Sequence, residues 1–147
     1  MFDIRFLIFL ILIIMIDTSQ ANYSPSFLEK VLWKNRIVIS FMPAIESSHS
    51  NAQSKNYEKE TEQWAERDLL FIEINPDLKV KRNGQLTNEV DASEFVKIFP
   101  SNPEEYLVVL IGKDGSEKHR SFKAIPNSLL FEIIDAMPMR QTEIMRD

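Results

Sequence analysis

The stretch YLVVLIGKDGSEKHRSF, residues 106–122, decides the fold of this 147-residue chain. Residues 106–111 form the strongest apolar and β-branched run of the sequence, which predicts a buried strand. The Asp114-Gly115 step then supplies a tight reversal into a second strand over residues 117–122. Because the strands of a hairpin are antiparallel, this stretch favours a mixed sheet over the alternative of a doubly wound parallel sheet.

Outward from the hairpin, hydrophobic periodicity and capping residues predict the other elements. A short helix leads into a central strand that stops at Pro43, and a polar loop over residues 44–54 leads into an amphipathic helix. A small hairpin at Asn83-Gly84 and a short helix capped by Asp91 follow the next strand. The expected elements upstream of the main hairpin cover residues 26–32, 37–42, 51–67, 69–74, 80–87 and 91–99.

The last expected helix follows the main hairpin. It begins near Pro126, must stop before Pro138, and buries one stripe of side chains: Leu129, Leu130, Ile133, Ile134 and Met137. The complete order resembles the thioredoxin fold, an α/β sandwich with a central mixed sheet and a C-terminal β-hairpin followed by a helix. The length of the chain and the lack of internal repeats predict a single domain.

Four segments match a family pattern together: Trp33-Lys34-Asn35-Arg36, Glu66-Arg67-Asp68, Leu110–Gly115 with Lys118, and Ile134–Arg140. On these segments the chain resembles the thioredoxin-like domain-of-unknown-function family of small exported bacterial proteins. It is also similar to domains of vertebrate sushi-repeat-containing and coiled-coil-domain-containing matrix proteins. The resemblance extends over about residues 28–143 and implies a fold and an extracytoplasmic setting, but no established reaction. The residues expected to carry the structural motif are Trp33, Arg36, Arg67, Asp68, Gly112, Gly115, Asp135, Met137 and Pro138.

The N-terminus is typical of a secretory signal peptide. Arg5 precedes the apolar run Phe6–Ile16, and the polar segment that follows ends in Ser19-Gln20-Ala21. This run is shorter than the roughly 20 helical residues that cross a bilayer, so we expect cleavage after Ala21 rather than an uncleaved anchor. The expected organisation is a signal peptide over residues 1–21 and a single domain over residues 22–147, exported to the periplasm or secreted.

Composition argues against two classes of function. The formal net charge of −5 at pH 7 argues against wholesale nucleic-acid binding. The chain contains no cysteine, and the position after the first strand, where a thioredoxin carries its redox cysteine, holds Pro43–Ser48. A serine hydroxyl neither attacks nor leaves as a thiolate does at neutral pH. Thiol–disulfide oxidoreductase, disulfide isomerase and peroxiredoxin activities are therefore excluded.

We expect no metal, no cofactor and no catalytic residue. His49 and His119 are the only imidazoles of the sequence, and neither has a partner at metal-ligand spacing. Ser47, Ser48 and His49 are neighbours in a loop, and sequence neighbours are rarely positioned for proton transfer. We interpret them as loop polarity rather than as parts of a catalytic triad.

A small basic cluster is the candidate binding site. Lys118 and Arg120 are two apart on a strand and therefore face one way, near Lys113 and Lys123. These cations either hold an anionic ligand, with Arg140, or pair with acidic side chains of the protein itself. The candidate binding residues are Lys113, Asp114, Lys118, Arg120 and Arg140.

Two function hypotheses from different classes remain. The favoured one is a non-redox binding module for another protein, an envelope component or an anionic polymer, with no transmembrane anchor after signal cleavage. The alternative is a non-thiol enzyme that uses the Lys/Arg/Asp cluster around the hairpin. A deep pocket with a strongly perturbed carboxylate would favour the enzyme, and a flat basic patch would favour binding.

Overall fold

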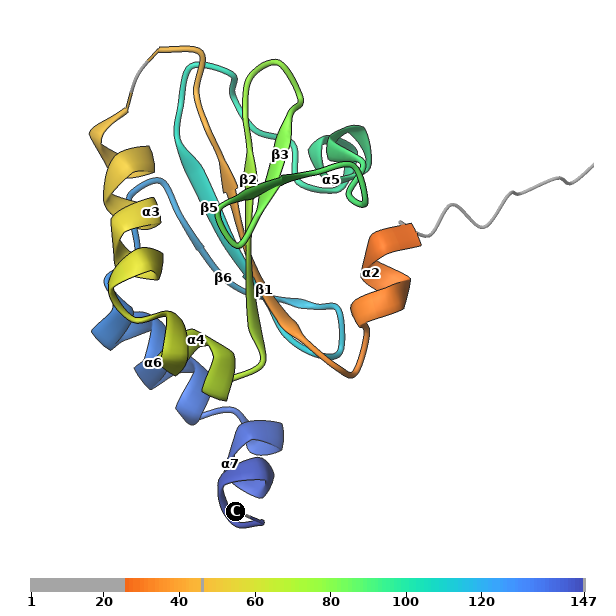
Figure 1. Ribbon diagram of the computed structural model, residues 1–147, viewed down its shortest axis with the longest axis vertical. Coiled ribbons are helices and arrows are strands. Elements are labelled where there is room, and N and C mark those ends of the chain that lie inside the picture. The colour runs from red at the N-terminus through yellow and green to blue at the C-terminus, as the bar shows by residue number, and fades with distance from the viewer. Residues whose placement is uncertain (1–25, 46, 147) are drawn as a thin grey trace, which may run out of the picture.

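The computed structural model describes residues 26–45 and 47–146, so the expected signal peptide lies outside the described residues. Figure 1 shows one sheet with helices on both of its faces. In chain order the elements are α2 (Ser26–Val31), β1 (Arg36–Phe41), α3 (Ser48–Lys59), α4 (Thr61–Glu66), β2 (Leu69–Ile74), β3 (Val80–Arg82), β4 (Gln85–Thr87), α5 (Ala92–Ile98), β5 (Leu107–Ile111), β6 (Glu117–Ser121), α6 (Asn127–Asp135) and α7 (Pro138–Ile144).

The sheet is mixed, as the sequence predicts. Its strand order is β4-β3-β2-β1-β5-β6, in which β1 runs parallel to β2 and the other neighbouring pairs are antiparallel. Every residue of β1, β2 and β5 is buried, as expected for nearly continuous apolar runs in strands covered on both faces. Both hairpins are confirmed, and Asn83 and Gly84 have φ values of 51° and 80°, as a tight hairpin turn demands.

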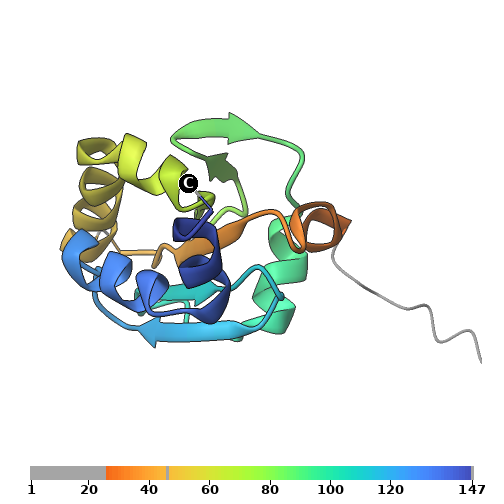
Figure 2. The ribbon, with the colours of Figure 1, turned by 90° about the horizontal axis from the view of Figure 1, so that it is seen from below.

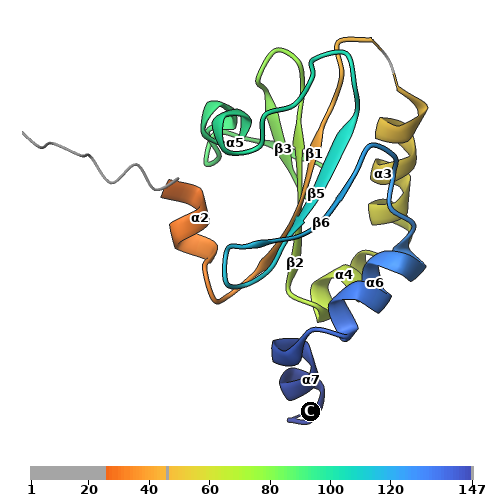
Figure 3. The ribbon, with the colours of Figure 1, turned by 180° about the vertical axis from the view of Figure 1, so that it is seen from behind.

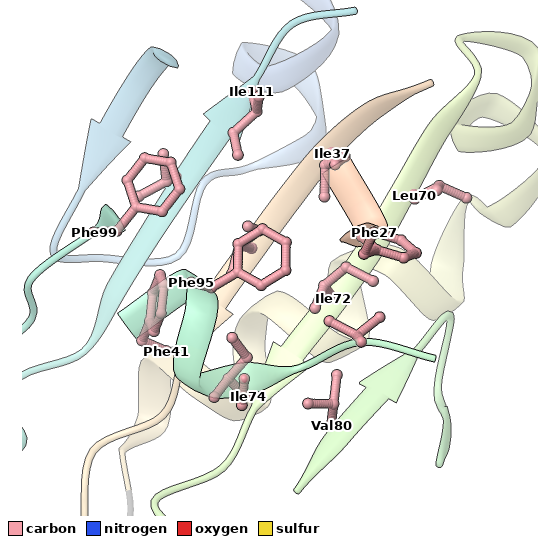
Figure 4. Close-up of a cluster of buried hydrophobic side chains, with 14 of the residues drawn as sticks. Phe27, Ile37, Phe41, Leu70, Ile72, Ile74, Val80, Phe95, Phe99 and Ile111 are labelled. Carbon is pink, nitrogen blue, oxygen red and sulfur yellow. The ribbon is translucent and has the colours of Figure 1, made fainter. Parts of the chain in front are cut away.

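Helices cover the two faces of the sheet in separate groups (Figures 1 and 3). On one face, α2 and α5 contribute Phe27 and Phe95, whose ring centroids lie 6.2 Å apart in an edge-to-face arrangement (Figure 4). On the other face, α4 and α6 contribute Trp64 and Leu130 to a second core. The buried indole Nε1 of Trp64 donates to Asn127 Oδ1 at 3.1 Å, which satisfies the one polar atom of that side chain.

The helix after the first strand differs from the prediction. α3 begins at Ser48 rather than near residue 51, because Ser47 caps it by accepting a hydrogen bond from the His49 N–H at 3.2 Å. The predicted single helix is also interrupted at Glu60, which is the C-cap of α3 and the N-cap of α4. The polar loop is therefore shorter than expected.

The C-terminal segment differs as well. Leu130 and Ile134 are fully buried as predicted, but Leu129 is 42% exposed. Pro138 ends the predicted helix and also occupies the first turn of a further helix, α7, because proline needs no backbone donor at that position. Met137 packs against the core around Trp64.

Candidate functional site

Motif segments that are far apart in the sequence meet at one end of the sheet. β1 and β2 are parallel and begin at this end, and β5, antiparallel to β1, finishes there. Arg36 is therefore close to Asp68, which precedes β2, and to Lys113, which follows β5. Seen from below, α7 lies across the same end of the molecule (Figure 2).

Glu143 of α7 contacts two buried cations at this end. Arg36 is 1% exposed, and its Nη1 and Nη2 donate to the two Glu143 carboxylate oxygens at 3.1 and 3.2 Å. Lys113 Nζ donates to Glu143 Oε1 at 2.6 Å and to Asp68 Oδ2 at 2.7 Å. These bonds join α7 to the first residue of β1 and to the turn after β5.

Asp135, at the end of α6, contacts two further cations. Arg67 Nε and Nη2 donate to its carboxylate oxygens at 3.0 and 2.7 Å, and Arg140 Nε donates to it at 3.2 Å. Arg140 Nη2 also donates to Glu66 Oε1 at 2.6 Å. We call the whole set the α7 ion-pair network, with the members Arg36, Arg67, Lys113, Arg140, Glu66, Asp68, Asp135 and Glu143.

Two carboxyl groups of the network, those of Asp135 and Glu143, have lowered pKa values. Burial alone would raise the pKa of Asp135, but the hydrogen bonds and charges of Arg67 and Arg140 outweigh it and hold that pKa below its ordinary value. Burial is likewise outweighed at Glu143, where Lys113 and Arg36 lower the pKa. A carboxyl group with a lowered pKa carries no proton at neutral pH and is a weak base, so Asp135 and Glu143 are suited to a structural role rather than to acid–base catalysis.

Other motif residues determine the backbone around the network. Trp33 has a φ of 63°, its N–H donates to the Lys113 carbonyl at 2.7 Å, and its side chain is 62% exposed. Gly115 has a φ of 78°, a region that favours glycine. A Cβ at Gly112 would lie 2.5 Å from Lys118 Cε, so the glycine leaves room for the lysine side chain to cross it.

Two of the candidate binding residues, Lys113 and Arg140, belong to the α7 ion-pair network and are 8% and 3% exposed. A pocket of about 210 Å³ lies beside Lys113 and is also lined by residues 137–139. Each of the two cations already has two carboxylate partners within 3.2 Å. An external anion would have to displace those carboxylates to bind them.

The other candidate residues lie on the main hairpin and are paired locally. Lys118 donates to Asp114 at 2.8 Å, and Arg120 donates twice to Glu117, at 2.9 and 2.7 Å. The hydrogen bond from Lys118 holds the pKa of Asp114 below its ordinary value, with a smaller opposing contribution from burial. β6 is an edge strand, and charged side chains on such a strand oppose pairing with other chains.

A larger pocket, of about 730 Å³, lies at the other end of the sheet, where β1 finishes. Ligands of open α/β sheets bind outside the carboxyl ends of the strands, and this pocket occupies that position beside the start of α3. We call it the β1-end pocket, and it is lined by Pro43, Ile45, Ser47, Ser48, His49, Glu104, Glu105, Tyr106 and Phe122.

The floor of the β1-end pocket is aromatic and its rim is exposed. Tyr106 is 4% exposed, its hydroxyl is 3.2 Å from Ser40 Oγ, and burial raises the pKa of that hydroxyl above its ordinary value. Ile45 and Phe122 are 72% and 60% exposed at the rim. Of this lining, the sequence draws attention only to Pro43–Ser48 and His49, which are interpreted as a polar loop, because the other lining residues come from a distant connection and from the end of β6.

The described residues contain no group of three or more His, Cys, Asp or Glu side chains that could hold a metal ion. Among the helices of these same residues, none combines the length and apolar character that a membrane span requires.

Comparison with known proteins places the chain in a structural context. The model of a family described as domain of unknown function (DUF4174) matches residues 27–143. No curated protein matches the chain. Similar solved structures include the reduced 2-Cys peroxiredoxin of Plasmodium vivax, at a TM-score of 0.55 and 14% identity over 78% of this chain and 72% of that one.

Two Plasmodium yoelii structures are also similar. Thioredoxin peroxidase I has a TM-score of 0.51 and 15% identity over 82% of this chain and 81% of its own. Prx1a, modified at its N-terminus, has a TM-score of 0.50 and 16% identity over 82% of each chain. At these identities the likeness shows the fold alone, and that fold is thioredoxin-like.

Proposed function

The chain belongs to the family of the domain of unknown function DUF4174, and from this premise we propose that it is an exported, non-redox, thioredoxin-like module that binds a partner protein. The solved structures that it resembles are named as peroxiredoxins or a thioredoxin peroxidase, whereas this chain has no cysteine. The fold is therefore kept without the thiol on which peroxidase chemistry depends.

The observation that carries the binding role is the β1-end pocket. It occupies the position after β1 where a thioredoxin carries its reactive group, and here that position holds Ser47 and Ser48. Large apolar side chains that are exposed together at the rim of a depression are typical of protein-binding surfaces. Ile45 and Phe122 form such a rim. Asp135 and Glu143 of the α7 ion-pair network, in contrast, have lowered pKa values and hold a structural element in place.

Export is supported by the sequence of residues 1–21. Arg5, the apolar run Phe6–Ile16 and the small residues at Ser19 and Ala21 together fit a cleavable leader. N-terminal sequencing of the protein from periplasm or medium tests this part of the proposal, and we expect the mature chain to begin at Asn22. A chain that starts at Met1 and stays in the cell fraction would contradict it.

Peptide selection tests the binding role. Purified protein is panned against a random-peptide phage library, and the selected peptides are measured against Phe122→Ser and against Leu129→Ser. Leu129 is a matched control because it is 42% exposed on α6, outside the β1-end pocket. Loss of an aromatic contact at the centre of an interface costs roughly 2 kcal/mol, so Phe122→Ser should weaken binding at least tenfold and Leu129→Ser should not change it.

Two results would overturn the proposed function. The first is that the library yields no binder to the wild-type protein. The second is that Phe122→Ser does not change the affinity of the selected peptides.

A further inference from the structure

The β1-end pocket carries an unbalanced negative charge. Glu104 and Glu105 are both exposed at its edge, and neither carboxylate forms an ion pair with another residue of the described chain. None of the described residues that line the pocket is a lysine or an arginine. The α7 ion-pair network differs in this respect, since its four carboxylates are matched by four cations.

Aromatic side chains lie beside these two carboxylates. Tyr106 and Phe122 both line the pocket, and the rings of His49 and Tyr106 have centroids 6.0 Å apart. The face of an aromatic ring carries partial negative charge and attracts ammonium and guanidinium groups. A pocket with aromatic walls and an acidic edge is therefore suited to the apolar stem and the charged head of a long basic side chain.

The start of α3 is a feature of the pocket that favours the opposite charge. A helix N-terminus is equivalent to roughly half a positive charge, and it acts only within the first turn. Ser47 Oγ already accepts one of the N–H groups of that turn, from His49. Two full negative charges at Glu104 and Glu105 outweigh this contribution.

We propose that the segment bound in the β1-end pocket is basic, with a lysine or arginine side chain that lies against Tyr106 and Phe122 and pairs with Glu104 and Glu105. This inference rests on the proposed function and adds the chemistry of the partner to it. The net charge of the chain acts in the same direction, since it stays acidic without residues 1–21 and draws positively charged partners toward the protein.

Three synthetic peptides test the inference. They share one central leucine and differ only in the flanking residues, which are lysine and arginine, glutamine, or glutamate. Their affinities for the full exported protein are measured by fluorescence anisotropy at low salt and at about 0.15 M salt. We expect the basic peptide to bind most tightly and to lose affinity at the higher salt.

A pair of double variants locates the charge. Glu104→Gln with Glu105→Gln removes two charges from the pocket, and Glu62→Gln with Glu132→Gln removes two exposed charges from α4 and α6. Two partly screened rim charges are together worth about tenfold in affinity. The first double variant should weaken the basic peptide by that factor and leave the glutamine peptide unchanged, and the second should leave both unchanged.

The outcomes separate this inference from the proposed function. If the glutamine or glutamate peptide binds as tightly as the basic one and Phe122→Ser abolishes that binding, the basic partner is refuted and the binding module stands. If the two double variants lower the affinity for the basic peptide equally, the positive charge of the peptide is not recognised at this pocket and the inference is refuted. If no peptide binds in a way that Phe122→Ser disturbs, both proposals are refuted.

Discussion

The substitution Glu143→Gln removes the negative charge that joins α7 to the sheet. In the native protein this carboxylate accepts hydrogen bonds from Arg36 and Lys113, which are 1% and 8% exposed. The glutamine amide at position 143 retains one acceptor oxygen but carries no charge, so Arg36 is left without a counter-charge. The Nε of Arg36 already lacks a hydrogen-bond partner. Lys113 keeps Asp68 as a partner.

The expected loss of stability lies between two limits. Breaking a fully buried ion pair by removing one partner costs about 3–5 kcal/mol, whereas an exposed pair is worth about 0.5 kcal/mol. The Glu143 side chain is 23% exposed, so water screens it in part. We expect the free energy of unfolding to fall by about 2 kcal/mol, which for a domain of this size lowers Tm by roughly 6–10 °C.

Urea unfolding followed by circular dichroism measures this change. The matched control is Glu132→Gln, an exposed glutamate of α6 with no ion pair among the described residues, and it should change stability by less than about 0.5 kcal/mol. Hydrogen exchange of the α7 amides shows whether that helix is released first. A Glu143→Gln protein as stable as the control would refute the view that the α7 ion-pair network holds the C-terminus.

Three further predictions follow from the described contacts. The pKa values of Asp135 and Glu143 are lowered in the folded protein, so the stability that these two carboxylates contribute is complete above their unfolded pKa values of about 4 and is lost as pH falls through their folded pKa values. Urea unfolding at a series of pH values below about 4 should therefore show the free energy of unfolding falling with pH, less steeply in Glu143→Gln than in the wild type. Because Lys118 and Arg120 are paired with carboxylates, Lys118→Ala with Arg120→Ala should not change the binding of acidic glycans measured by calorimetry, and a clear loss would instead establish the anionic-ligand site. Gly84→Ala should lower stability by about 1 kcal/mol in thermal unfolding, because φ is 80° and the surrounding space is open, so strain is the only cost; an unchanged Tm would show that the turn relaxes.

Local sequence patterns predicted most of the elements. The apolar run of residues 106–111 and the Asp114-Gly115 step gave a strand and a turn because both signals act between near neighbours. The prediction placed the end of the last helix before Pro138 but did not include α7. Proline is compatible with both the end of one helix and the start of the next, and no nearby residue distinguishes the two.

The candidate sites were less predictable than the elements. The sequence grouped Lys113, Lys118, Arg120 and Arg140 as one basic cluster, whereas the structure divides them between a buried network and an exposed hairpin. Glu143 had no signal of its own, because an isolated glutamate near the C-terminus is ordinary surface composition. The β1-end pocket was missed except for its loop, since its lining joins three separate parts of the chain.

By itself the sequence determined the alternation of strands and helices, the mixed sheet and the absence of thiol chemistry, because each depends on residue type or on spacing within one segment. Only the tertiary structure decided which charges are neutralised within the protein and which are left exposed. Arg36 and Glu143 are 107 positions apart, and they meet because β1 begins at the end of the sheet across which α7 lies. Ion pairing depends on distance in space and on exclusion of water, and the local sequence determines neither of them.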